Sequence, residues 1–323
     1  MGKRRRIAAL GALLLVWAAP HARASEHEPK WAQTERKQNP LVDVKIYKDG
    51  KGGIQAYART DMGGQFIEVI AFGTNDPKMA VSDSHAISLA LATARVIAYE
   101  KLAERVGEVR VDSRTLLKTQ LINVKVVKLK VSEVIRGARI LEEKYNLVAP
   151  REVRAVVKLG LLISGGRNNL LGPIYSPAAL PAIRKNAGNL TLYRPPSPAA
   201  RKPAKPKRFT GLIVDASGLS AAPAIFPRLV AGKGPKVVYN ENSVEKRVFL
   251  RRESIVKYAS SMAAAQKNYA DLLGKEPLIV RAKKAVGKMK TDLELSSEDA
   301  NAVLAADVMT GFLKKAQVVL IVN

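Results

Sequence analysis

The sequence predicts an α+β protein with two mixed sheet-and-helix domains joined by a linker rich in Pro, Lys and Arg. Alternating apolar and polar residues predict strands in both halves of the chain, and an apolar stripe at three- and four-residue steps predicts a long helix over 82–106. Five prolines and six basic residues fall within 194–208, a composition that cannot contribute to a core. The expected domains are therefore 41–193 and 209–323.

An export signal is expected over residues 1–24. Basic residues at 3–6 precede an apolar run at 7–19, and small alanines follow before Ser25, which is the pattern of a cleaved signal peptide. The apolar run is shorter than the roughly 20 residues needed to span a bilayer, and a retained anchor is the alternative. We predict a mature protein exported to the periplasm, with residues 25–40 as a flexible tail.

The composition limits the chemistry that the protein can perform. The chain has no cysteine, which excludes disulfides, thiolate catalysis, zinc thiolate sites and the acylated cysteine of a lipoprotein. It carries 54 basic and 28 acidic residues, and 49 basic residues remain once the signal is removed, for a mature net charge of +21. Such a charge attracts polyanions in general, unless it serves only solubility. Because the protein is expected to be exported, anionic glycan, lipid headgroups or an acidic protein are better expected partners than nucleic acid.

The first domain should begin with a β-hairpin. Apolar residues alternate with polar ones from Val42 to Tyr47, and the DGKGG turn at 49–53 leads into a second extended run. Further strands are predicted at 66–72, 134–145 and 153–163 from their alternation and β-branched content.

The long helix over 82–106 should pack on this sheet through one face. Its expected apolar stripe consists of Ile87, Leu91, Ala94, Ala98, Leu102 and Val106. Gly107 is expected to end the helix. Residues 109–115 look extended, whereas residues 119–132 fit both a helix and a strand, with the helix favoured.

The second domain should also mix strands and helices. Its expected strands are 209–215, 225–230, 236–239, 277–286, 291–295 and 317–322. Helix signals occupy 253–273, and Ser296 or Ser297 can cap a last helix. The glycine-rich stretches of both domains lack the spacing of phosphate-binding loops, so no nucleotide site is predicted.

His85 and Asp215 are the side chains best suited to catalysis, but neither has the neighbours that catalysis needs. His85 lies in the first turn of the long helix, where adjacent side chains point about 100° apart and cannot converge as a triad. Asp215 ends an apolar strand, where α/β enzymes often place a catalytic acid, yet a turn aspartate that binds the following backbone explains it as well. We predict no catalytic residue, no metal site and no cofactor, with a hydrolase using His85 or Asp215 as the alternative.

The linker supplies the one candidate binding site that the sequence suggests. Its basic residues lie on an extended backbone, where a polyanion could neutralise several charges at once, although a plain spacer is the alternative. The candidate contacts are Arg201, Lys202, Lys205, Lys207 and Arg208.

A resemblance covers roughly residues 65–163. The segments AFGTNDP, HAISLALATARVIAYEKLAERVGEV, VRVDSRT and VIRGARILEEKY follow one another in this order. This order resembles the bacterial small surface lipoprotein family and the N-terminal domain of flagellar assembly protein T. The corresponding positions are Val109, Val111, Ser113 and Thr115 in the VRVDSRT segment, Gly137, Ala138 and Arg139 in the GAR turn, and Ala92, Ala94, Arg95, Ala98 and Leu102 in the helix.

The resemblance implies a helix packed on a sheet and a role in envelope or flagellar assembly without catalysis, and it supplies no catalytic residues. The second half is similar to a companion domain of exported proteins for which no activity is implied. We therefore expect a non-catalytic structural or assembly component of the cell envelope, with the flagellar base as one candidate location. A periplasmic module that binds glycan or lipid anions is the alternative.

Overall fold

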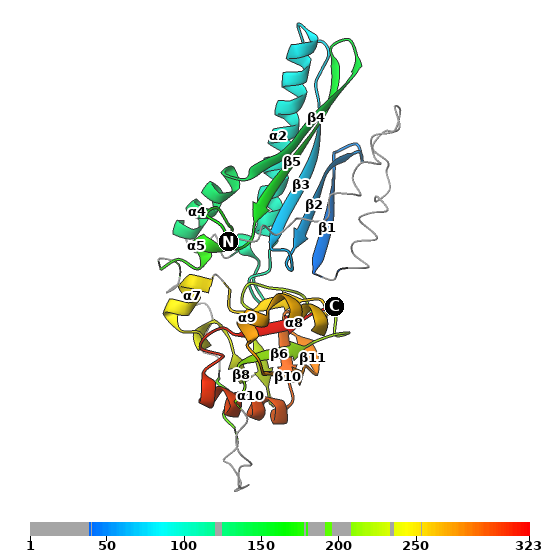
Figure 1. Ribbon diagram of the computed structural model, residues 1–323. Coiled ribbons are helices and arrows are strands. Elements are labelled where there is room, and N and C mark those ends of the chain that lie inside the picture. The colour runs from blue at the N-terminus through cyan, green and yellow to red at the C-terminus, as the bar shows by residue number, and fades with distance from the viewer. Residues whose placement is uncertain are drawn as a thin grey trace.

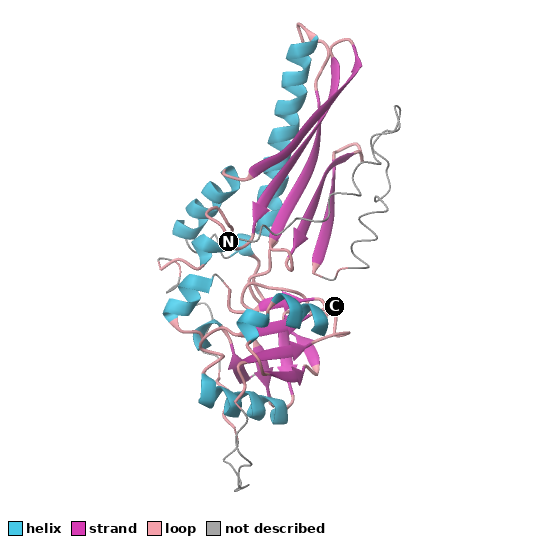
Figure 2. Cartoon of the chain, viewed as in Figure 1, coloured by secondary structure: helices cyan, strands magenta, loops and turns pink. Residues whose placement is uncertain are grey.

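Figure 1 shows the computed structural model of the chain, which describes residues 39, 41–119, 125–177, 179, 191–195, 208–232, 236–252 and 254–323. The predicted signal peptide, nearly all of the predicted tail and residues 196–207 of the linker lie outside these residues. Both described units combine sheets with helices, which confirms the α+β class and the two-domain layout. In Figure 2 the strands of the first domain form one tall sheet, and those of the second domain form a compact group beneath it.

The first domain is built on an antiparallel five-stranded sheet with the order β1-β2-β3-β5-β4. Its strands are β1 (Val42–Lys48), β2 (Ile54–Asp61), β3 (Phe66–Thr74), β4 (Arg139–Ala149) and β5 (Glu152–Leu162). The Asp49 carboxylate accepts hydrogen bonds of 2.8 Å from the backbone amides of Lys51 and Gly53, which fixes the turn of the predicted hairpin. The hairpin and the strands predicted at 66–72 and 153–163 are confirmed.

Helix α2 (Asp83–Gly107) lies along one face of this sheet, as Figure 1 shows. Its buried apolar side chains are Ala86, Ala90, Ala94, Ala98, Leu102 and Val106. The predicted stripe is therefore correct from Ala94 onward, whereas Ile87 and Leu91 lie beside the stripe and are only partly buried. The helix ends at Gly107, as predicted.

Gly73 on β3 explains why alanines occupy the centre of this helix face. A Cβ atom at Gly73 would lie 2.4 Å from the Ala94 nitrogen and 2.5 Å from the Ala90 carbonyl oxygen. The backbones of α2 and β3 are thus in direct contact, and larger side chains would force them apart.

Two of the positions carried over from the resembling helix face solvent. Ala92 and Arg95 are both exposed. Arg95 donates two hydrogen bonds to the Glu143 carboxylate on β4, at 2.5 Å and 2.7 Å, so it ties α2 to the edge of the sheet.

Helix α4 (Lys125–Arg136) confirms the helical interpretation of the ambiguous segment for the residues described. The strand predicted at 134–145 is wrong over its first residues, because Val134 continues the buried stripe of α4 and β4 begins only at Arg139. The segment predicted to be extended at 109–115 forms a tight turn instead. Its Asp112 carboxylate accepts the backbone amides of two following residues, which closes the turn.

The second domain contains two four-stranded sheets, with the orders β10-β6-β13-β9 and β11-β12-β7-β8. The strands are β6 (Gly211–Asp215), β7 (Leu229–Ala231), β8 (Lys236–Tyr239), β9 (Lys257–Ala259), β10 (Pro277–Arg281), β11 (Lys284–Val286), β12 (Asp292–Leu295) and β13 (Val318–Ile321). The first of these sheets is entirely parallel. Its central strands β6 and β13 are continuous apolar runs, as expected of parallel strands that are buried on both faces.

The helices of this domain are α7 (Lys246–Arg252), α8 (Met262–Asn268), α9 (Ala270–Leu273) and α10 (Ser297–Thr310). Ser296 caps α10 by accepting the Asp299 amide at 2.9 Å, which confirms the predicted cap. The helix predicted over 253–273 is wrong in part, because β9 lies within that range and pairs with β13. The short helices α8 and α9 follow it within the same range.

The two domains contact each other through the 109–115 turn. The amides of Ile225 and Phe226 donate to the carbonyls of Arg110 and Val111, at 3.0 Å and 2.7 Å. Tyr175 follows α5 (Leu171–Ile174), and the centroid of its ring lies 4.3 Å from the centroid of the Phe249 ring in the second domain. Direct backbone and aromatic contacts therefore hold the domains together.

The end of the predicted first domain pairs with the second domain. Leu192 forms a bridge with Val237, and the Tyr193 amide donates to the Val237 carbonyl at 2.8 Å. Residues 191–193 therefore extend the β8 edge, although they were predicted within 41–193.

Candidate functional site

The two side chains suited to catalysis both serve the backbone around them. The His85 amide donates to the Ser82 hydroxyl at 3.2 Å, and the His85 Nδ1 atom accepts the Val81 amide at 3.3 Å, so the residue organises the start of α2. Asp215 accepts both the amide and the hydroxyl of Ser217, at 2.9 Å and 2.5 Å. These hydrogen bonds lower the pKa of Asp215. The structure places His85 and Asp215 in different domains and does not bring them together.

Of the five basic residues proposed to bind a polyanion, the structure describes one. Arg208 is exposed just before β6. Arg201, Lys202, Lys205 and Lys207 lie outside the described residues. The linker hypothesis therefore stays a prediction.

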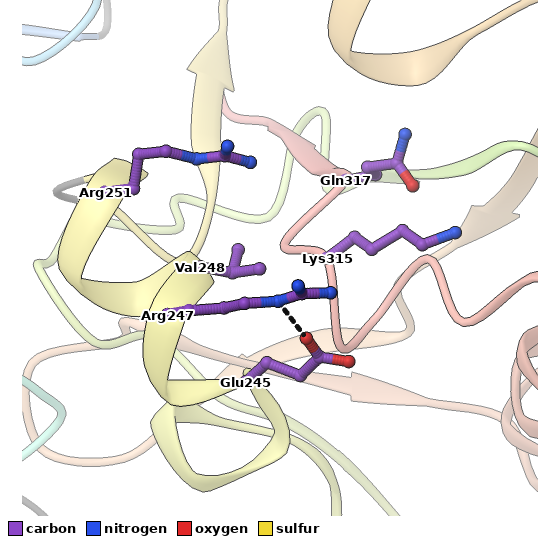
Figure 3. Close-up of a pocket in the computed structure, with 6 residues that line it drawn as sticks. All are labelled: Glu245, Arg247, Val248, Arg251, Lys315 and Gln317. Carbon is purple, nitrogen blue, oxygen red and sulfur yellow. Dashed lines mark hydrogen bonds and ion pairs between the residues drawn. The ribbon is translucent and has the colours of Figure 1, made fainter.

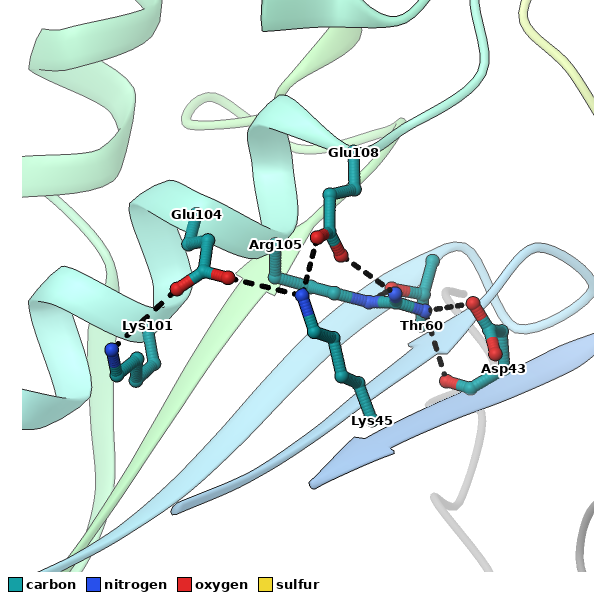
Figure 4. Close-up of polar contacts among 7 residues, drawn as sticks. All are labelled: Asp43, Lys45, Thr60, Lys101, Glu104, Arg105 and Glu108. Carbon is teal, nitrogen blue, oxygen red and sulfur yellow. Dashed lines mark hydrogen bonds and ion pairs between the residues drawn. The ribbon is translucent and has the colours of Figure 1, made fainter. Parts of the chain in front are cut away.

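A polar cluster joins the end of α2 to β1 and β2 (Figure 4). The buried Arg105 guanidinium donates to the Thr60 hydroxyl at 2.7 Å, to Glu108 at 3.2 Å and to the Asp43 carboxylate at 2.5 Å. Lys45 lies beside it and pairs with both Glu108 and Glu104. Because nearly every charge has an opposite partner, the cluster is well suited to fix the helix on the sheet.

A groove of about 570 Å³ lies between this cluster and the second domain. Its polar lining includes Arg105, Arg110 and Lys118, and Ala221, Ala222 and Pro223 line it from the second domain. Pockets at domain boundaries often bind ligands, but the carboxylates of Asp43 and Glu108 also line this one. The groove is therefore lined by charges of both signs and does not favour either an anionic or a cationic ligand.

A second polar cluster is buried where the domains meet. Arg228 lies 3.8 Å from the Asp112 carboxylate of the first domain, and its backbone amide donates to Asp292 at 3.2 Å. Glu241 is buried beside this group, and its Oε2 atom has no hydrogen-bond partner among the residues that the structure describes. Burial raises the pKa of both Glu241 and Asp292, since the low-dielectric surroundings disfavour their ionised forms.

A pocket of about 340 Å³ opens between α7 and the segment before β13 (Figure 3). Its lining residues are Glu245, Arg247, Val248, Arg251, Lys315 and Gln317. Arg247 pairs with Glu245 at 3.0 Å, and the Lys315 amine donates to the Thr310 carbonyl at 2.7 Å. This pocket was not predicted from the sequence. The four-residue spacing of its arginines is visible in the sequence, whereas the approach of Lys315 to them appears only in the fold.

The edge strand β4 exposes an unusual number of apolar side chains. Among the described strands it forms backbone pairs with β5 alone, and none of its eleven residues is buried. The large apolar side chains that are at least 42% exposed are Ile140, Leu141, Tyr145, Leu147 and Val148. The opposite edge differs, because Val42, Val44 and Tyr47 of β1 are buried.

Among the residues that the structure describes, no helix is long and apolar enough to cross a bilayer. Within the same residues, no group of three or more histidine, aspartate or glutamate side chains is arranged to hold a metal ion.

The comparison with protein families concerns the second domain. Residues 211–323 match the family model for the second domain of Treponema pallidum Tp0624. The matched range starts at β6 and ends with the chain, so it supports a distinct C-terminal companion domain. No curated protein matches the chain.

Proposed function

We propose that this protein is a non-catalytic, exported component of the cell envelope that acts by binding another protein chain through the edge strand β4. The observation that carries the proposal is the exposed apolar edge itself. An uncovered strand presents unpaired backbone amides and carbonyls, and an extended segment of a partner can add to it as a further strand. Natural proteins usually protect such edges, so a long exposed one suggests a binding surface.

The charges on β4 also favour docking. Edge strands are commonly protected by unpaired charges that repel a second strand. On β4, however, Glu143 binds Arg95 and Lys144 pairs with Glu142, which leaves Arg139, at the first position of the strand, as its one charge without an ion pair among the described residues. The paired charges are compensated within the domain, and the apolar side chains on either side of them remain exposed. A partner strand would therefore meet apolar surface with little charge repulsion.

The resemblance of the first half supports an assembly role for the protein. The helix-on-sheet arrangement is the one implied by the small surface lipoproteins and by the N-terminal domain of flagellar assembly protein T. On this basis we propose an assembly role in the periplasm, with a flagellar protein as one candidate partner. Cleavage of the signal before Ser25 belongs to the same proposal and is checked by N-terminal sequencing of the exported protein.

The proposal is tested by adding charge to the edge. Tyr145→Lys combined with Leu147→Lys places two cations on β4, where the native side chains are 51% and 44% exposed. In source cells that lack the gene, this variant should fail to complement the deletion and should be lost from the envelope fraction. The matched control is Val308→Lys with Met309→Lys on α10, whose side chains are also exposed and whose charge change is the same.

Variants of the two catalytic candidates should behave differently from the β4 variant. His85→Ala and Asp215→Asn should both complement the deletion, because neither residue is needed for association. Normal function of the β4 variant, or loss of function in a folded His85 or Asp215 variant, would contradict the proposal. Circular dichroism of each purified variant establishes that it is folded.

A further inference from the structure

We propose that the pocket between α7 and the segment 314–317 binds a phosphate-type oxyanion. The site is separate from β4 and lies entirely in the second domain. Three of its six lining side chains are cations and a fourth, Gln317, carries an amide. One carboxylate, that of Glu245, faces them.

The cations come from two elements that the fold brings together. Arg247 and Arg251 are four residues apart on α7, so they lie on the same side of the helix. Lys315 and Gln317 flank Ala316 on the segment that leads into β13. Figure 3 shows both arginine side chains extending from α7 towards the segment that carries Lys315 and Gln317.

The charges in the pocket are not balanced. Glu245 is engaged by Arg247, which leaves Arg251 and Lys315 without an ion-pair partner among the described residues. Lys315 donates to a neutral backbone carbonyl, and this contact leaves its charge uncompensated. Like charges four residues apart on a helix repel each other, so a bound anion would relieve an unfavourable arrangement.

The lining selects for a compact oxyanion. Guanidinium groups donate two parallel hydrogen bonds to carboxylate or phosphate oxygens, and a lysine adds a point charge. Val248 is the one apolar residue among the six, so the pocket offers little to a large apolar ligand. Its volume of about 340 Å³ accommodates a phosphate or a phosphomonoester group.

The backbone beside Lys315 is held in an uncommon conformation. Ala316 has a φ of 53°, in the left-handed region that residues with a Cβ atom rarely adopt. Its methyl group is buried, and the backbone amide of Gln317 donates to the Phe312 carbonyl at 2.9 Å. The side-chain amide of Gln317 donates to the Leu272 carbonyl at 3.0 Å. This fixed turn positions Lys315 and Gln317 before any ligand arrives, and such strain often occurs at binding sites.

The test uses the mature protein at low salt and inorganic phosphate as the probe in a calorimetric titration. Wild type should show saturable binding, and Arg251→Gln combined with Lys315→Gln should weaken it at least tenfold. Lys275→Gln combined with Lys288→Gln is the matched control, because both lysines are exposed, lie outside the pocket and change the net charge equally. The control should bind phosphate like wild type.

A parallel arm distinguishes free phosphate from a lipid headgroup. Sedimentation with phosphatidylglycerol vesicles is compared with sedimentation with phosphatidylcholine vesicles for the same three proteins. If wild type binds phosphate but not phosphatidylglycerol vesicles, and only the pocket variant loses phosphate binding, the ligand is a soluble phosphate. If wild type binds phosphatidylglycerol vesicles, and the pocket variant loses this binding while the control variant keeps it, the ligand is a lipid headgroup. If the pocket variant matches the control variant in both arms, or if wild type binds neither probe, the oxyanion site is overturned.

Discussion

Replacing Gly73 by alanine should destabilise the first domain more than the same change at Gly160 on β5, where the new Cβ would meet only the Leu141 side chain. The new Cβ would lie 2.4 Å from the Ala94 nitrogen, 2.5 Å from the Ala90 oxygen and 2.8 Å from the Ala94 Cα atom. All three atoms belong to the backbone of α2, so no side chain can rotate away. Ordinary contact begins at 3.4 Å, and the helix must therefore retreat from β3 by about 1 Å.

The expected loss is about 3 kcal/mol in the free energy of unfolding. Overpacking a well-filled interior costs about 1–3 kcal/mol, and a gap of about 1 Å along the alanine stripe forfeits up to about half of its dispersion energy. Alanine also restricts the unfolded chain, which returns at most about 1 kcal/mol. Urea unfolding of the mature protein, followed by circular dichroism, measures the difference.

Two companion variants make the reasoning about Gly73 refutable. Gly50→Ala is the control, because no described residue other than its chain neighbours lies within 4 Å of its new methyl group, and its effect should stay within about 0.5 kcal/mol. Ala94→Gly added to Gly73→Ala should give no rescue, since the clash is with backbone atoms. A loss below about 1 kcal/mol for Gly73→Ala, or recovery in the double variant, would show that α2 does not contact β3 this closely.

Three other predictions concern stability and accessibility. Leu102→Asp should destabilise the protein by several kcal/mol because Leu102 is fully buried, and urea melts should show a much smaller loss for Leu91→Asp at the margin of the stripe. Burial raises the pKa of Glu241, so its stabilising contribution is present below its ordinary pKa and is lost as pH rises above it. The unfolding free energy of wild type, measured by urea melts at a series of pH values, should therefore fall more steeply than that of Glu241→Gln as pH rises above the ordinary pKa of a glutamate. Brief trypsin treatment should cut first between Arg201 and Arg208, giving two stable fragments, and first cuts within 41–163 would contradict the predicted linker.

The sequence was most informative where one pattern had one structural solution. The alternation before and after DGKGG admits only a hairpin, and Ser296 before an acidic first turn specifies a helix start. The long helix was also predictable, but its exact face was not. Periodicity weights large apolar residues such as Ile87 and Leu91, whereas the closest contact is made by small residues opposite Gly73.

Long-range contacts could not be predicted from the chain alone. The β9 segment is too short to be distinguished from its helical neighbours without its partner β13. The oxyanion pocket likewise depends on the approach of α7 to Lys315, which lies more than sixty residues further along the chain. The exposed edge of β4 follows from strand order, and alternation within the strand gives no information on that order.

Photocrosslinking inside source cells tests most directly whether β4 is the binding surface. A photoreactive amino acid replaces Leu147 on β4 in one variant and Val308 on α10 in another, two exposed apolar positions in different domains. We expect a discrete protein adduct from position 147 that disappears when Tyr145→Lys is added, and no such adduct from position 308. Equal adducts from both positions, or none from position 147 in a variant that complements the deletion, would contradict association through β4.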